Sequence, residues 1–94
     1  MAQQQRYLTC GVDQSIPLEL QLFMWECVER MQKPRDYLQV FTLKPAGAIQ
    51  SVTHTSEEPE YHMEYAIPME QPIAAKVYII DDEMHSTMLL AEEY

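Results

Sequence analysis

The sequence predicts an α+β fold in which one long helix packs on a curved, mainly antiparallel sheet. Three observations support this class. The stretch Ser15–Gln32 places apolar residues at helical spacing, whereas the chain after Pro34 repeatedly alternates apolar and polar residues, as strands do. Short turn sequences separate the alternating stretches, and short connections favour antiparallel neighbours. We expect one strand, the helix and then five further strands, in a single domain over residues 1–94.

The first two elements are predicted from their boundary residues. Arg6–Val12 is the first expected strand, and a turn then leads into the helix. Ser15 is a suitable N-cap because its hydroxyl can accept a hydrogen bond from an amide of the first helical turn. Pro17 fits that turn, where its missing N–H is not needed. The helix is expected to end near Pro34, since the residue before a proline avoids helical geometry.

The remaining elements are strands bounded by turn residues. They are predicted at Asp36–Leu43, Ala48–Thr55, Glu60–Ile67, Ala75–Ile80 and Thr87–Ala91. The first of these carries apolar residues on both faces, which indicates a central strand. The second is rich in β-branched and polar residues, which indicates a half-exposed strand.

Composition and charge limit the possible partners and location. Six Lys and Arg against 15 Asp and Glu give a formal net charge of −9. Such a surface repels phosphate backbones and anionic membranes. No apolar run exceeds four residues, which is too short to cross a bilayer, and the polar segment Met1–Gln5 predicts no signal peptide. We therefore expect a cytoplasmic protein that binds neither nucleic acid nor membranes.

The predicted helix is apolar on two sides. At 100° per residue, the side expected to bury against the sheet carries Ile16, Leu20, Phe23, Met24, Cys27 and Met31. A second group, Leu18, Leu22 and Trp25, lies roughly opposite. Either the curved sheet and its loops cover both sides, or this second group is an interface with another protein or a second copy of the chain. Trp is enriched at such interfaces.

Two histidines are candidates for a metal site. If the turn between two predicted strands centres on Glu58, His54 and His62 lie directly opposite each other in an antiparallel hairpin. With a carboxylate such as Glu58 they offer the ligands of a divalent cation. The alternative is a pair of half-exposed histidines beside an acidic turn that bind nothing.

A second group of possible metal ligands lies near the end of the chain, at Asp81, Asp82, Glu83 and His85. Oxygen ligands clustered in a turn can bind Ca²⁺ or Mg²⁺. The spacing matches no calcium-loop pattern, because it lacks the central glycine and the distal glutamate. A solvated hairpin turn is the favoured interpretation.

The tyrosines on the predicted sheet are candidates for binding a small ligand. They are Tyr37, Tyr61, Tyr65 and Tyr78. Tyrosines on a curved sheet can line a pocket and offer hydroxyl groups to a ligand. They also make ordinary packing contacts, and a domain of this size has little room for a cavity once the helix is docked.

Four segments, in this order over nearly the whole chain, resemble a known family. They are IPLELQLFMW, DYLQVF, EEPEY and TMLLAEEY. In these segments the chain is similar to the bacterial domain of unknown function family 960, small uncharacterised proteins of Gram-positive bacteria. The resemblance implies a small cytosolic α+β domain. It implies no reaction, no catalytic residue and no ligand.

No set of residues predicts catalysis. Ser15 is better used as a helix cap than as a nucleophile, Cys10 has no histidine nearby in sequence, and neither glycine stands in a phosphate-binding motif. We expect no catalytic residue and no cofactor. The favoured hypothesis is a non-enzymatic interaction module that uses Leu18, Leu22 and Trp25 to bind another protein or to form a homodimer. The alternative is a protein that binds a small ligand through its tyrosines or a metal through His54 and His62.

Overall fold

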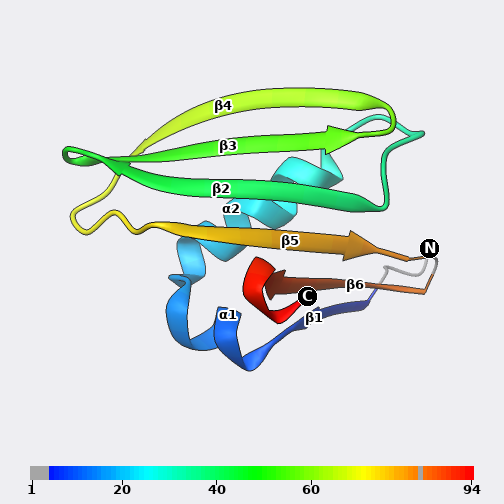
Figure 1. Ribbon diagram of the computed structural model, residues 1–94, viewed down its shortest axis with the longest axis horizontal. Coiled ribbons are helices and arrows are strands. Elements are labelled where there is room, and N and C mark those ends of the chain that lie inside the picture. Colours follow the sequence, from blue (N-terminus) through cyan, green and yellow to red (C-terminus); the bar gives the residue numbers. More distant parts are fainter. Residues whose placement is uncertain (1–4, 83) are drawn as a thin grey trace.

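The computed structural model describes residues 5–82 and 84–94, which form an α+β fold of a mixed sheet with two helices on one face (Figure 1). The predicted α+β class is therefore confirmed. The elements in chain order are β1 (Gln5–Leu8), α1 (Cys10–Ser15), α2 (Leu18–Glu29), β2 (Leu38–Ala46), β3 (Ile49–Glu57), β4 (Glu60–Pro68), β5 (Ala75–Asp81), β6 (His85–Leu90) and the short 3-10 helix η1 (Ala91–Glu93).

Within the described residues the sheet has six strands in the order β1-β6-β5-β2-β3-β4. Four of the five neighbouring pairs are antiparallel, and β1 pairs with β6 in parallel. The strand β2 pairs with both β5 and β3, as predicted for a strand with apolar residues on both faces. In Figure 1, β4 forms one edge of the sheet and β1 the other.

The N-terminal part of the fold differs from the prediction. The strand β1 ends at Leu8, and α1 follows because the hydroxyl of Thr9 caps it by accepting the N–H of Val12 at 3.3 Å. Ser15 is the last residue of α1 and caps no helix, while Pro17 takes the N-cap position of α2. The predicted helix over Ser15–Gln32 is thus a shorter helix of 12 residues with a six-residue helix before it.

The core lies between the helices and one face of the sheet. Its largest fully buried apolar side chains are Leu20, Met24, Phe41, Leu43, Ile79 and Met88. Strand β3 contributes alternate residues to this face, and two of them, Gln50 and His54, are polar and fully buried. Neither of the described helices has the length and apolar character needed to cross a membrane.

Candidate functional site

The side of α2 that faces away from the sheet carries two exposed leucines. Leu18 is 66% exposed and Leu22 is 55% exposed. They stand four residues apart, so their side chains are neighbours on the helix surface. The carboxylates of Glu19, Glu26 and Glu29 are exposed on the same side of the helix. We call these five residues the α2 patch.

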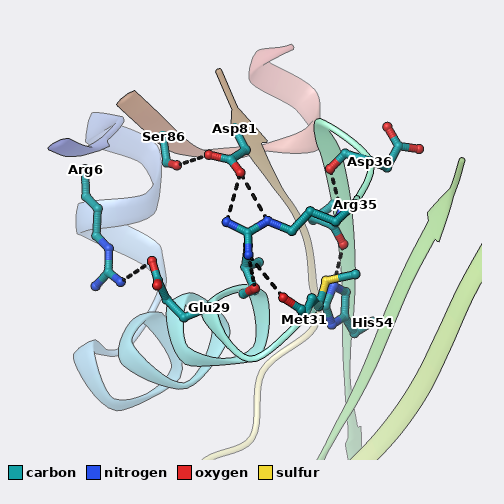
Figure 2. Close-up of polar contacts among 10 residues, drawn as sticks. Arg6, Glu29, Met31, Arg35, Asp36, His54, Asp81 and Ser86 are labelled. Atoms are coloured by element: carbon teal, nitrogen blue, oxygen red, sulfur yellow. Dashed lines mark hydrogen bonds and ion pairs between the residues drawn. The ribbon is translucent and has the colours of Figure 1, made fainter. Parts of the chain in front are cut away.

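Trp25 does not belong to this exposed surface, contrary to the sequence-based expectation. Its side chain is only 7% exposed, and the guanidinium of Arg6 lies over the ring, 5.0 Å from its centroid. Arg6 is held there by a hydrogen bond from its Nη2 to Glu29 Oε1 at 3.0 Å (Figure 2). Strand β1, at the edge of the sheet, brings Arg6 beside α2. Helical periodicity alone does not reveal this contact between separate elements.

The α2 patch includes two ion pairs on its rim. Arg6 pairs with Glu29, and Arg30 pairs with Glu26 one turn earlier on the same helix. All four side chains are between 42% and 75% exposed. Exposed pairs of this kind contribute little to stability, about 0.2 to 1 kcal/mol each. The patch is therefore an apolar pair within a mainly acidic rim.

The predicted metal site at His54, His62 and Glu58 is not formed. Glu57 pairs with Glu60 across the turn, so His54 lies opposite Met63 and His62 lies opposite Thr55. A shift of one residue in register turns a side chain to the other face of the sheet. His54 is therefore fully buried on the helix side, whereas His62 is exposed and lies beside Glu64, with Nε2 3.0 Å from Oε2.

The described residues of the acidic turn do not gather metal ligands either. Asp81 is engaged by Arg35 and Ser86, and Asp82 Oδ1 accepts the N–H of Met84 at 2.9 Å. His85 Nε2 lies 3.6 Å from the carboxylate of Asp82. Glu83, which the sequence-based hypothesis included, lies outside the described residues. Across residues 5–82 and 84–94, no three His, Cys, Asp or Glu side chains are grouped so that they could hold a metal ion.

His54 is instead a core residue with a fixed hydrogen bond. Gln39 Nε2 donates to the carbonyl of Asp36 at 2.7 Å, which leaves Gln39 Oε1 to accept the Nε2–H of His54 at 2.7 Å. The imidazole stacks on Phe41 with ring centroids 4.2 Å apart and contacts Tyr61 at 4.9 Å. Burial away from water disfavours the charged ring and lowers the pKa of His54 to about 4.

This environment predicts that acid weakens the fold through His54. Between its ordinary pKa of 6.5 and the native pKa of about 4, the unfolded chain binds a proton that the native state does not bind. The stabilisation is complete above that range and is lost as the pH falls through it, by about 3 kcal/mol in total. Urea unfolding of the wild type and of His54→Gln, between pH 7 and about pH 4.5, measures the effect.

The glutamine variant serves as the control because it does not titrate, so its stability should fall less over this range. Asp36 also responds to acid, because the backbone N–H of Glu58 lowers the pKa of its carboxyl group from 3.8. That response lies at lower pH and is shared by both proteins. If the free energy of unfolding falls equally with pH in the wild type and in His54→Gln, the prediction is wrong.

The four tyrosines do not converge on one pocket, contrary to the ligand-binding hypothesis. Tyr61 and Tyr65 lie on the helix side of β4, whereas Tyr78 lies on the opposite face against Tyr94, with ring centroids 5.4 Å apart. Tyr37 precedes β2 and is 60% exposed.

Of the two tyrosines on the helix side of β4, Tyr65 packs against the helix and Tyr61 borders a pocket. Tyr65 meets Phe23 edge to face at 5.1 Å, and burial raises the pKa of its hydroxyl group to about 12. Tyr61 borders an open pocket of about 360 Å³ between the end of α2 and the β3–β4 turn. The pocket is lined by Arg30, Met31, Gln32, Pro34, Pro59, Glu60 and Tyr61, so none of the other three tyrosines contributes to it.

A polar cluster that the sequence did not predict joins α2 to the sheet (Figure 2). Arg35 donates from Nη2 and Nε to Asp81 Oδ2 at 3.2 and 3.3 Å, and from Nη1 to the carbonyl of Val28 at 2.8 Å. Asp81 Oδ1 accepts the hydroxyl of Ser86 at 2.7 Å. The Arg35 and Asp81 side chains are only 10% and 15% exposed, which indicates a structural role.

Comparisons with known proteins agree with the resemblance found in the sequence. Residues 5–93 match the family described as "Staphylococcal protein of unknown function (DUF960)". A crystal structure of a protein of unknown function from Enterococcus faecalis is similar, with a TM-score of 0.84 and 25% sequence identity. The match covers 97% of this chain and 91% of that chain. Among curated proteins, none matches the sequence.

Proposed function

Because the chain belongs to the DUF960 family, for which no function is known, its role has to be inferred from its own surface, and we propose that it is a protein-interaction module whose α2 patch binds another protein. The observation that carries this proposal is the exposure of Leu18 and Leu22 side by side on α2. Apolar side chains grouped on the otherwise charged exposed side of a helix are typical of helix surfaces that dock on a partner.

The charge around the two leucines indicates which kind of partner fits. Glu19, Glu26 and Glu29 outnumber the two arginines that pair with them, and the whole chain carries −9. Two copies that met through this patch would bring their carboxylates together, which opposes association. A partner with an apolar contact ringed by Lys or Arg is attracted at long range and matches the rim. We therefore assign the patch to a basic protein partner.

The test compares two double variants that change charge and hydrophobicity equally. Leu18→Lys/Leu22→Lys replaces the two apolar side chains of the patch by cations. Ile49→Lys/Met84→Lys makes the same two changes at apolar residues outside the patch, which are 40% and 77% exposed. Each protein is immobilised and incubated with bacterial lysate. A protein that is retained by the wild type and the control, but lost by the patch variant, is then purified and titrated by calorimetry.

We expect the dissociation constant to rise at least about tenfold in the patch variant, which corresponds to roughly 1.4 kcal/mol. The affinity should also fall as salt is added, because charge attraction across an exposed rim is screened. Thermal unfolding of all three proteins should agree closely, since the changed side chains are exposed. Equal affinities for the patch variant and the control would exclude the α2 patch as the binding surface.

A further inference from the structure

The strand β4 presents a long free edge. All nine of its residues, Glu60–Pro68, pair with β3 on one side. Within residues 5–82 and 84–94 no strand pairs with its other side, which forms the upper edge of the sheet in Figure 1. The opposite edge, β1, has only four residues. A long unpaired edge is a template on which another strand can add through main-chain hydrogen bonds.

The sequence of β4 is complementary to itself about Met63. Reading outward from this residue, the neighbours are His62 and Glu64, and then Tyr61 and Tyr65. If a second copy pairs antiparallel with its Met63 opposite the first, each His62 faces the partner's Glu64, and each Tyr61 faces the partner's Tyr65. A histidine that can donate a hydrogen bond to the carboxylate opposite it, and aromatic residues placed directly across an antiparallel pair, make favourable contacts.

We propose that two copies of this chain pair through β4, antiparallel and centred on Met63, to form one continuous sheet across a two-fold axis. The side chains that meet are accessible. Met63 is 44% exposed, and the side chains of His62 and Glu64 are 58% and 74% exposed. His62 and Glu64 already lie 3.0 Å apart within one strand, so pairing places two histidines and two carboxylates in alternation on one face.

Charge selects this register over its neighbours. A pairing centred on Glu64 places two carboxylates of that residue opposite each other, and a pairing centred on His62 places Glu60 opposite Glu64. Like charges directly opposite each other are destabilising. In a register that places His62 opposite Met63, polar residues of the solvent face meet apolar residues of the helix face. This mismatch also weakens pairing. The Met63-centred register avoids both problems.

The geometry of the pair has a consequence for the α2 patch. Opposed residues of an antiparallel pair project to the same side of a sheet, and Tyr61 and Tyr65 project to the helix side of β4. Both copies therefore carry their helices on the same side of the joined sheet. The dimer then presents two α2 patches in one direction, which allows bivalent binding of the partner and rests on the function proposed above.

Light scattering after gel filtration, at two protein concentrations, tests the proposal. We expect the wild type to reach twice the chain mass of 11.0 kDa at the higher concentration. His62→Glu creates two carboxylate oppositions in each dimer, so dimerisation should weaken at least about tenfold. The double variant His62→Glu/Glu64→Lys places a lysine opposite each new carboxylate and should restore the dimer. Met84→Glu adds a carboxylate at a site that is 77% exposed and far from β4, and it should leave the dimer unchanged.

Amide hydrogen exchange supplies a second measurement on the same samples. The outward amides of β4 should exchange more slowly in the dimer than in His62→Glu. A wild type that stays monomeric at both concentrations overturns the proposal. A dimer that survives His62→Glu, or that His62→Glu/Glu64→Lys fails to restore, overturns the β4 assignment. Loss of the dimer in Leu18→Lys/Leu22→Lys assigns self-association to α2 and also overturns it, whereas loss of partner capture alone in that variant concerns only the proposed function.

Discussion

Replacing Arg35 by alanine is expected to lower the free energy of unfolding by about 3 kcal/mol or more, in the range found when one member of a buried ion pair is removed. Arg35 is 10% exposed on its side chain and donates to Asp81 and to the carbonyl of Val28. Without the guanidinium, the Asp81 carboxylate stays largely buried, with its side chain 15% exposed. Among the side chains of the described residues, only the hydroxyl of Ser86 then donates to it. The end of α2 loses a donor at the same time.

Urea unfolding followed by circular dichroism measures this loss. Arg30→Ala is the matched control because Arg30 also pairs with a carboxylate, that of Glu26, but is 75% exposed. An i,i+4 pair on a helix surface contributes about 0.3 to 0.5 kcal/mol, so the control should remain close to the wild type. If Arg35→Ala and Arg30→Ala cost the same, the cluster at Asp81 does not join α2 to the sheet.

A third variant separates the charge from the rest of the side chain. In Arg35→Ala/Asp81→Asn no carboxylate is left without its cation, so part of the lost stability should return. With Asp81→Asn as the second single variant, the departure of the double variant from the sum of the two single losses measures the coupling energy of the two side chains. Equal losses in the single and the double variant would show that packing and the bond to the Val28 carbonyl account for the effect.

The C-terminal strands were predictable because their evidence is local. Alternation marks β2 through Phe41 and Leu43, and β5 through Val77 and Ile79, all of which are buried. The predicted strand Ala75–Ile80 differs from β5 by one residue at its end. A strand with one buried face repeats every second residue whatever lies across the sheet. Such a signal can therefore be recognised within a short stretch of sequence, without knowledge of the rest of the chain.

The contacts that define the candidate site were not predictable, because they join residues far apart in the chain. Arg6 covers Trp25 only because β1 lies parallel to β6 at the sheet edge. Arg35 meets Asp81 across 46 positions. The histidine hypothesis failed by a single residue, since Glu57 pairs with Glu60 and the turn does not centre on Glu58. One residue is enough to turn His54 into the core.

The α2 patch was half predictable for the same reason. Helical periodicity placed Leu18, Leu22 and Trp25 on the side away from the sheet, and the first two are exposed. It does not reveal how far neighbouring elements reach around the helix. Trp25 points toward the flank that β1 covers, so the residue with the strongest interface propensity became part of the core.

Trp25→Ala is therefore expected to destabilise the fold by about 3 to 5 kcal/mol, the range for truncation of a buried aromatic side chain. The ring is 7% exposed and belongs to the same buried cluster as Leu20 and Met24. Leu22→Ala, at a position that is 55% exposed on the same helix, is the matched control and should change stability by about 0.5 kcal/mol at most. Urea unfolding followed by far-ultraviolet circular dichroism compares the two.

Arg6→Ala distinguishes the two contributions at this ring. The guanidinium lies 5.0 Å from the ring centroid, and a partly exposed cation–π contact contributes about 0.5 to 1 kcal/mol. Its loss should therefore be well below that of Trp25→Ala, because most of the effect comes from burial. Trp25 is the single tryptophan of the chain, so acrylamide quenching of the wild type tests its burial independently. Strong quenching, with a small loss in Trp25→Ala, would return this residue to the exposed surface and restore the three-residue interface.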